Sequence, residues 1–293
     1  MKKFEEVFER AVGEKRVVAV AAAADFHVLE AVAAAVDRGI AEFVLFGDEE
    51  RIREIAGEVG LKKFEVVAEN DDVKACGKAV RFVAEGKADA IMKGIVETGT
   101  IMKAVLDKEA GMRTGRKLSH LAAFELGTYH KLLFVTDAAI NIAPDLEGKK
   151  EILANAAAAM GNLGIEKPLI ALLAAKEKAD DKMPVTLEYV DIVAEHKRGF
   201  LAEAVLDGPL ALDNAISAES CEIKGIVSPV GGDADLLFCP NIEVGNVLYK
   251  SLAFLAGAKN GGVVVGAKRP IILTSRADSA ESKLISIALS VLF

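Results

Sequence analysis

The feature that most constrains this fold is the regular alternation of short apolar runs with longer amphipathic segments. Each of the first four runs leads into a helical pattern, and three of those helical patterns open on an aspartate. Strands that are apolar along most of their length are typical of parallel sheets covered by helices on both faces. The sequence therefore predicts an α/β fold. The four predicted strands are residues 16–24, 42–47, 63–68 and 88–92.

The second half of the chain repeats this alternation. Before it, two strands follow each other closely, 118–126 and 132–136, separated only by the polar link 127–130. Such a hairpin-like link breaks the parallel rhythm, so we place a domain boundary there, and a length of 293 residues suits two domains. The later predicted strands are 169–173, 201–205, 234–238 and 261–266, with helices over 184–197, 213–219 and 242–258.

Composition narrows the classes of function. With 52% hydrophobic and 27% charged residues, the chain has material for a large core. A net charge of −8 argues against non-specific nucleic-acid binding. The N-terminus lacks a secretory signal and no apolar run is long enough to span a bilayer, so we expect a cytoplasmic protein. The three cysteines and four histidines are scattered, which predicts neither a disulfide framework nor a metal site.

The end of the chain carries a polar strand–helix junction. Residues 271–274 read as a buried strand, after which Ser275 and Arg276 precede a helix whose N-cap is Asp278 or Ser279. In open α/β sheets ligands bind at the carboxyl ends of the strands, and a helix N-terminus presents N–H groups to anions. The junction is therefore a candidate anion site.

Two further segments suit anions. Lys93 ends the fourth strand and runs into a turn with Thr98, followed by a helix that carries Lys103, and Arg113 and Arg116 lie in a short basic stretch. Arginine forks match phosphate oxygens in pairs, but an ordinary capped loop and a solvated surface loop explain these segments equally well. The common phosphate-loop, dinucleotide and zinc-hydrolase motifs do not occur.

Several separated motifs, taken together and in order, resemble the phosphate acyltransferases, the family of phosphotransacetylase and phosphate butyryltransferase. Within that family, the match to phosphate butyryltransferase is closer. The resemblance covers essentially the whole chain. The motifs are residues 92–94 with 97–98, 113–116 with 118–120, 141–145, 183–186, 207–215, 228–235, 240–250 and 274–279.

The resemblance implies the reaction butanoyl-CoA + phosphate ⇌ butanoyl phosphate + CoA. It also implies two three-layer αβα domains with an interdomain cleft, arranged as in isocitrate and isopropylmalate dehydrogenases. The first domain would comprise residues 1–128 and 267–293, and the second, residues 129–266, would form a homodimer. Coenzyme A enters as a substrate, with no tightly bound cofactor and no metal, because both acyl donors are already activated.

By the same resemblance, Ser275 serves the tetrahedral intermediate and Arg276 the substrate anions. The acetyl-specific members place their catalytic aspartate six residues after that arginine, where this chain has Ser282. Asp278 is then the candidate general base, although Asp278 and Glu281 have the spacing of a capping box, which gives Asp278 an alternative role as a helix cap.

The remaining candidates would bind phosphate or the phosphates of coenzyme A. Each has a plain structural alternative, such as a solvated loop side chain or a packed helix face. These candidates are Lys93, Thr98, Lys103, Arg113, Arg116, Ser119, Ser228 and Asn246.

Three other functions remain open. Acetyl transfer would use the same site, and the choice between acetyl and butanoyl depends on the volume of the acyl pocket, which the sequence does not give. One methylene is worth about 1–3 kcal/mol of discrimination. An NAD-linked decarboxylating dehydrogenase would use the same implied fold but needs a metal-binding carboxylate cluster. A catalytically inactive coenzyme A-binding regulatory domain is compatible with Ser282, whereas the intact Ser275–Arg276 pair argues against it.

Overall fold

The computed structural model describes residues 1–13, 15–274 and 278–293 and divides the chain into two compact units. We call residues 4–116 and 260–293 the N/C unit, and residues 1–3 and 117–259 the middle unit. The chain returns to its first unit at the end, as the resemblance implies. The divisions fall at 116/117 and 259/260, earlier than the expected 128/129 and 266/267.

The earlier first division follows from strand pairing. Strand β5 (Ser119–Glu125) pairs antiparallel with β6 (Leu133–Thr136), with Ala122 opposite Val135, so both strands of the predicted hairpin belong to the middle unit. Likewise β10 (Lys259–Val265) pairs with β11 (Ile271–Ile272) in the N/C unit.

The sheet of the N/C unit has the order β3-β2-β1-β4-β11-β10. All neighbours are parallel except β10 and β11, so the predicted parallel sheet is confirmed here. The remaining strands are β1 (Val17–Ala21), β2 (Glu42–Gly47), β3 (Glu65–Ala68) and β4 (Ala90–Lys93).

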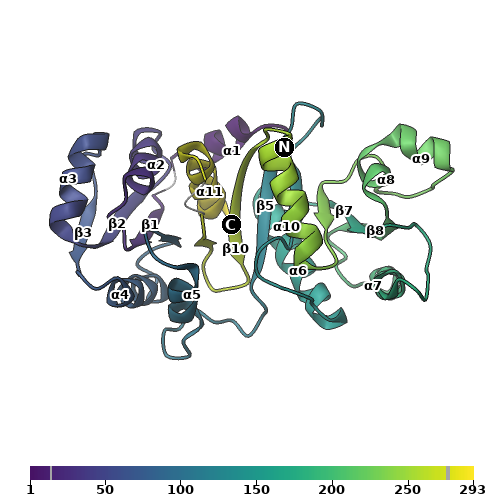
Figure 1. Ribbon diagram of the computed structural model, residues 1–293, viewed down its shortest axis with the longest axis horizontal. Coiled ribbons are helices and arrows are strands. Elements are labelled where there is room, and N and C mark those ends of the chain that lie inside the picture. The colour runs from purple at the N-terminus through teal and green to yellow at the C-terminus, as the bar shows by residue number, and fades with distance from the viewer. Residues whose placement is uncertain (14, 275–277) are drawn as a thin grey trace. The chain divides into compact units, whose positions relative to one another are not determined.

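Helices cover both faces of this sheet (Figure 1). On one face α11 packs against α1 and α2, and on the other α4 packs against α5 and β1. The three aspartates that open predicted helical patterns are N-caps: Asp25, Asp48 and Asp71 each accept a hydrogen bond from a backbone N–H three residues on. The helices are α1 (Phe4–Ala11), α2 (Phe26–Asp37), α3 (Glu49–Val59), α4 (Asp72–Ala84), α5 (Thr98–Leu106) and α11 (Ala280–Leu292).

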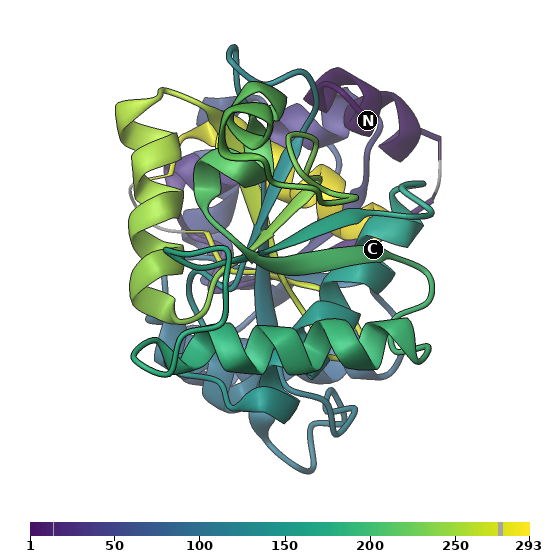
Figure 2. The same ribbon diagram turned by 90° about the vertical axis from the view of Figure 1, so that its right-hand side faces the viewer.

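The middle unit has the strand order β5-β6-β9-β7-β8 (Figure 2). Beyond the β5–β6 hairpin its strands are parallel. Tyr189 packs on Phe238 from one face, and Tyr249 packs on Phe124 from the other. The elements are β7 (Leu169–Leu173), β8 (Val205–Leu210), β9 (Leu236–Phe238), α6 (Leu146–Asn162), α7 (Pro184–Lys197), α8 (Leu212–Ile216), α9 (Ala218–Lys224), α10 (Ile242–Lys250) and the π-helix η1 (Ser251–Leu255).

Three predicted elements of this unit are wrong in detail. The strand predicted over 201–205 begins only at Val205. Leu201 adopts a left-handed φ of 55°, and its carbonyl accepts the Ala204 N–H, so residues 201–204 form a turn. The helix predicted over 213–219 is two short helices, and Ser217 caps the second. The helix predicted over 242–258 changes to a π-helical turn at Ser251.

The α/β class is confirmed in both units. No helix of the described residues combines the length and the hydropathy that a membrane crossing requires.

Candidate functional site

The carboxyl edge of β1, β4 and β11 brings the turn after Lys93 close to the end of β11. Ile91 and Met92 of β4 pair in parallel with Ile271 and Ile272 of β11, and Lys93 pairs with Ala21 of β1. Because the three strands run in the same direction, the turn after Lys93 and the chain after β11 leave the sheet at one edge. This edge is the candidate active-site wall.

Lys93 lies inside this edge rather than reaching into solvent. It is 5% exposed, and its Nζ donates to the carbonyl oxygens of Gly94 and Val96, each at 3.2 Å. A buried ammonium group needs such acceptors. We conclude that Lys93 shapes the loop that follows β4.

Gly94 lets that loop cross β1 closely. The N–H groups of Gly94 and Ile95 donate to the carbonyls of Ala21 and Ala22, both at 2.8 Å. A Cβ atom at Gly94 would lie 2.0 Å from the Ala22 carbonyl oxygen, so no other residue fits without moving the backbone. The path from β4 to α5 is therefore fixed by main-chain contacts.

The other predicted anion-binding residues of this unit that the structure describes are on its surface. Thr98 begins α5, and its side chain and those of Lys103, Arg113 and Arg116 are exposed. The basic stretch lies by the β10–β11 turn, at the opposite edge of the sheet from the turn after Lys93, because the Thr114 hydroxyl donates to the Gly266 carbonyl at 2.5 Å. These exposed groups are available to an anionic ligand.

The first turn of α11 differs from the predicted capping box. Ser279 is the N-cap, and its Oγ accepts the Ser282 N–H at 3.1 Å. The box predicted from Asp278 and Glu281 is therefore wrong by one residue, because the helix begins at Ala280. Asp278 is half-buried and precedes the cap. Ser282, at the position of the family's aspartate, has its Oγ 3.1 Å from the Ser279 Oγ.

Ser275 and Arg276 lie outside the described residues, so their roles stay predictions. What the structure describes is both ends of the segment that carries them: β11 held by β4, and Asp278 at the entry to α11.

Sequence reasoning missed Lys283. Its side chain is 3% exposed, and its Nζ donates to the Asp278 carbonyl at 2.5 Å. The signal was present, since a lysine in the first turn of an apolar helix opposes the helix dipole and is an unusual choice there.

The three candidates of the middle unit bond to their own unit. Ser119 is 1% exposed and its Oγ accepts from Asn155 Nδ2 at 3.2 Å. Ser228 Oγ accepts the Val230 N–H at 3.3 Å, which closes a turn. The Asn246 Nδ2 donates to the Ala138 carbonyl at 3.1 Å. Each side chain thus has a structural contact beside any ligand role.

Sequence reasoning also missed Asp137, which organises the loop after β6. Its buried carboxylate accepts the N–H groups of Ala139 and Ile140 at 2.8 and 3.0 Å, and the Asn141 side-chain amide at 2.6 Å. The Asn141 amide also donates to the Leu118 carbonyl at 2.8 Å. This loop is a rigid platform at the carboxyl edge of the middle sheet.

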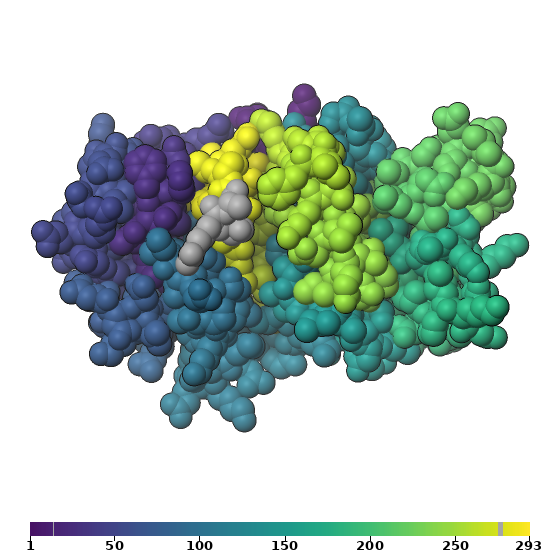
Figure 3. All heavy atoms as spheres, viewed as in Figure 1, coloured from purple at the N-terminus to yellow at the C-terminus, as the bar shows by residue number. Residues whose placement is uncertain are grey.

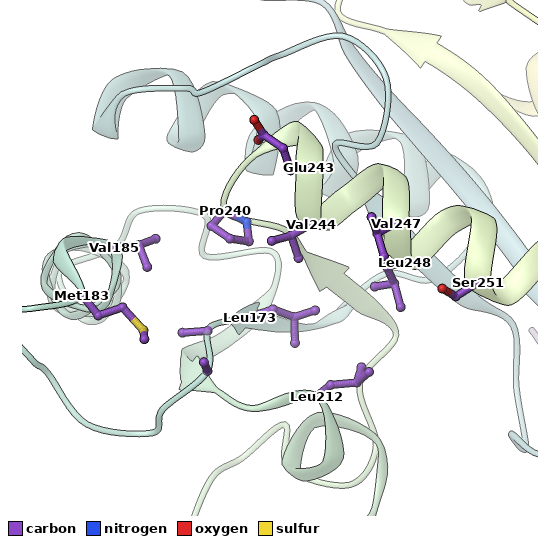
Figure 4. A pocket seen from close by; sticks show the side chains of 12 residues that line it. Leu173, Met183, Val185, Leu212, Pro240, Glu243, Val244, Val247, Leu248 and Ser251 are labelled. Carbon is purple, nitrogen blue, oxygen red and sulfur yellow. The ribbon is translucent and has the colours of Figure 1, made fainter.

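An apolar cavity of about 760 Å³ also lies in the middle unit. It opens beside α10 and η1, the yellow-green surface in Figure 3. In Figure 4, Val244 and Leu248 of α10 face Leu173 and Leu212 across the cavity, and Met183 and Val185 line its far side.

None of the three cysteines suits nucleophilic catalysis. All are buried, and burial raises the pKa of Cys76 to about 11 and that of Cys239 to about 12. Burial also raises the pKa of Cys221. A thiol is a poor nucleophile at neutral pH when its pKa is this high. Within residues 1–13, 15–274 and 278–293, no three histidine, cysteine, aspartate or glutamate side chains are grouped to hold a metal ion.

Comparison with known proteins places this chain in a family. The family model described as phosphate acetyl/butaryl transferase matches residues 3–77 and 63–291. The phosphate butyryltransferase of Clostridium acetobutylicum is 45% identical over 100% of this chain and 98% of its own length. The phosphate acetyltransferase of Thermotoga maritima is 40% identical over 99% of each.

A solved structure agrees. The crystal structure of a branched-chain phosphotransacylase from Enterococcus faecalis V583 superposes with a TM-score of 0.84 at 36% identity, covering 94% of this chain and 98% of that one. By sequence and by fold, the chain belongs to the phosphate acetyl/butaryl transferase family.

Proposed function

We propose that this protein moves a short-chain acyl group between coenzyme A and inorganic phosphate, with butanoyl as the preferred group. The observation that carries the proposal is the 45% identity to a phosphate butyryltransferase along the entire chain. Both acyl donors are activated, so the reaction requires no nucleotide, metal or tightly bound cofactor. We also propose a cytoplasmic location.

In the direction of thioester synthesis, the sulfur of coenzyme A attacks the carbonyl carbon of butanoyl phosphate. A carbon–sulfur bond forms, the thiol proton passes to a base, and the tetrahedral oxyanion collapses as the carbon–oxygen bond to phosphate breaks. A thiol of pKa about 8.5 is only a few per cent ionised at pH 7, so a base contributes about 10²–10⁴-fold.

Asp278 is the base in this proposal. The cap of α11 is supplied by Ser279, so the helix N-terminus does not require the Asp278 carboxylate as its cap. Asp278 lies two residues after Arg276 and three after Ser275 in the chain. Ser275 would stabilise the oxyanion, where one well-placed donor is worth roughly 3 kcal/mol. Arg276 would bind the departing phosphate through paired hydrogen bonds.

The exposed groups of the N/C unit would bind the anionic substrates. Arg113, Arg116 and Lys103 supply positive charge in a protein of net charge −8, and Thr98 supplies a hydroxyl at the start of α5. Arginine binds phosphate oxygens bidentately, and lysine binds them as a point charge.

Acetyl transfer is the second candidate. It is supported by the 40% identity to the Thermotoga phosphate acetyltransferase over 99% of the chain. The two candidates differ by two methylenes in the acyl pocket, which corresponds to about 2–6 kcal/mol if each contributes independently.

The partner that we propose is a second copy of the chain, bound through α10 and η1. Val247, Phe254 and Leu255 are exposed there, Leu255 by 87%, next to the apolar cavity of the middle unit. Exposed apolar surface of this kind is typical of an interface. We expect a mass of twice 31.0 kDa in light scattering, and a Leu255→Glu variant of the monomer mass. A monomeric wild-type protein at micromolar concentration would contradict this proposal.

Thiol release tests the proposed activity. Purified protein receives phosphate with acetyl-, butanoyl- or isobutanoyl-CoA, and liberated coenzyme A is followed with a thiol reagent. We expect release that depends on phosphate and a kcat/KM that is highest for butanoyl-CoA. Phosphate-dependent release that favours acetyl-CoA would support the second candidate, and no release from any thioester would exclude the transferase. A dehydrogenase would release no thiol here and would reduce NAD only when a 2-hydroxy acid is added as hydride donor, and coenzyme A binding without turnover would indicate the regulatory domain.

A further inference from the structure

Lys283 is a buried cation in a position that helix physics disfavours. It lies in the first turn of α11, where the helix dipole repels positive charge, and it is 3% exposed. Removing an ammonium group from water is costly unless nearby groups compensate. The surroundings of Lys283 must therefore supply that compensation.

One compensating contact is made to the segment that precedes the helix. The Lys283 Nζ donates to the main-chain carbonyl of Asp278 at 2.5 Å. This bond crosses the N-cap, since Ser279 lies between Asp278 and the helix. It ties the end of the β11–α11 connection, residues 273–279, to the body of α11.

The other compensating groups are carboxylates. Burial lowers the pKa of the Lys283 ammonium group, and the negative charges of Asp278, Asp25 and Glu30 oppose that shift. Asp25 caps α2 and Glu30 lies within α2, the helix that packs on α11. The buried Lys283 thus lies near the carboxylate of the candidate base, Asp278, and near those of Asp25 and Glu30 at the start of α2.

The β11–α11 connection is anchored at both of its ends. At its start β11 is paired with β4, with Ile272 opposite Met92. At its end the Asp278 carbonyl is held by Lys283. Ser275, Arg276 and Asp278, the residues of the proposed reaction, all belong to this connection. Catalytic groups lose rate when they are misplaced by about 1 Å, so such anchoring has a functional value.

We propose that Lys283 is a positioning residue, which holds Asp278 in place for acyl transfer. This inference rests on the proposed function. It explains why a lysine occupies a position where an apolar side chain of similar length would pack without the cost of desolvation. Polar residues that break a local rule without stabilising the fold are expected at functional sites.

A Lys283→Met variant separates positioning from stability. Methionine has a similar length, suits a buried site and carries no charge. Asp25 is half-buried and Glu30 exposed, so water can solvate their carboxylates once the lysine is gone. We expect an unchanged or higher melting temperature, a kcat at least about tenfold lower, as expected when catalytic groups lose their alignment, and a KM for butanoyl-CoA within about twofold of wild type.

The matched control is Lys131→Met. Lys131 is also a largely buried lysine that donates to a carbonyl, that of Asp233, at 2.8 Å, and pairs with the Asp235 carboxylate at 2.7 Å. It lies just before β6, at the opposite end of that strand from the Asp137 loop. Lys131→Met should keep the wild-type kcat even where its melting temperature falls.

Turnover of the folded variants decides between positioning and a purely structural role. A folded Lys283→Met protein whose kcat falls less than about threefold would overturn the inference, as would a fall in kcat that Lys131→Met reproduces. If Lys283→Met does not fold, Lys283→Leu, which likewise has no donor for the Asp278 carbonyl, is measured instead by the same criterion. If neither variant folds, Lys283 is a stability residue and the inference is wrong. A wild-type protein without phosphate-dependent thiol release would instead refute the proposed function.

Discussion

The Oγ of Ser279 accepts the backbone N–H of Ser282 at 3.1 Å, and this bond caps α11. The finding assigns two neighbouring polar residues to different tasks. Ser279 caps the N-terminus of the helix. Asp278 precedes that cap and follows the segment that carries Ser275 and Arg276. Substitutions at these two positions should therefore affect different properties of the protein.

Asp278→Asn should lower turnover far more than stability. An amide cannot take the thiol proton, so kcat should fall about 10²–10⁴-fold. Because Asp278 is not the cap, and Asp25 and Glu30 still face Lys283, the melting temperature should fall only slightly. Ser279→Ala is the control and should do the reverse, with a loss of about 1 kcal/mol of unfolding free energy. Full turnover by Asp278→Asn would remove Asp278 from the mechanism.

Arg276→Ala should impair the use of phosphate. Loss of a charge-assisted hydrogen-bonded contact is worth about 1.5–3 kcal/mol, or roughly 10- to 100-fold in kcat/KM for phosphate. Circular dichroism should show an unchanged fold. Arg51→Ala, an arginine paired with Glu54 on the surface of α3, should leave the kinetics unchanged. Equal kinetics for the two variants would show that Arg276 has no role.

Gly94→Ala should destabilise the N/C unit strongly. The added methyl group would lie 2.0 Å from the Ala22 carbonyl oxygen, so the strand or the loop has to move, at an expected cost above about 3 kcal/mol. Gly77 lies within α4, where an added methyl group would meet open space, so Gly77→Ala should gain about 0.5–1 kcal/mol. Urea denaturation measures both. A Gly94→Ala protein as stable as wild type would contradict the close crossing of β1 by the loop after β4.

The three cysteines should be unreactive in the folded protein. Burial raises the pKa of Cys76 to about 11 and that of Cys239 to about 12, so few thiolates exist at pH 8. A thiol reagent should label none of them at pH 8 before denaturant is added and all three afterwards. Fast labelling of one cysteine, with loss of turnover, would point to a protein thiol in the reaction.

Local patterns in the sequence identified most elements but not their neighbours. The strands β4 and β11 are visible as apolar runs, but nothing local says that Ile91 pairs with Ile271. That pairing forms the site edge and is set by the packing of the whole unit. The prediction that the last strand and helix return to the first unit came from the family resemblance and not from the periodicity of the sequence.

The sequence left two N-caps open for α11, Asp278 and Ser279, which are comparable cap residues, and the structure has Ser279. Errors arose where the folded chain overrides a local pattern. The apolar run at Leu201 suits a strand, but the chain turns there with a positive φ. Lys93 was predicted as an anion-binding or solvated loop lysine and Lys283 was given no role, because burial of a lysine depends on carbonyl acceptors that only the folded chain provides.

Phosphorus NMR provides the most direct test of the central claim, that this protein interconverts acyl-CoA and acyl phosphate. Butanoyl-CoA and inorganic phosphate are incubated with catalytic amounts of the purified protein. We predict a new acyl-phosphate resonance that grows as inorganic phosphate declines, reverses when excess coenzyme A is added, and grows roughly 10- to 100-fold more slowly with Arg276→Ala. Hydrolysis of the thioester without an acyl-phosphate resonance would contradict the account.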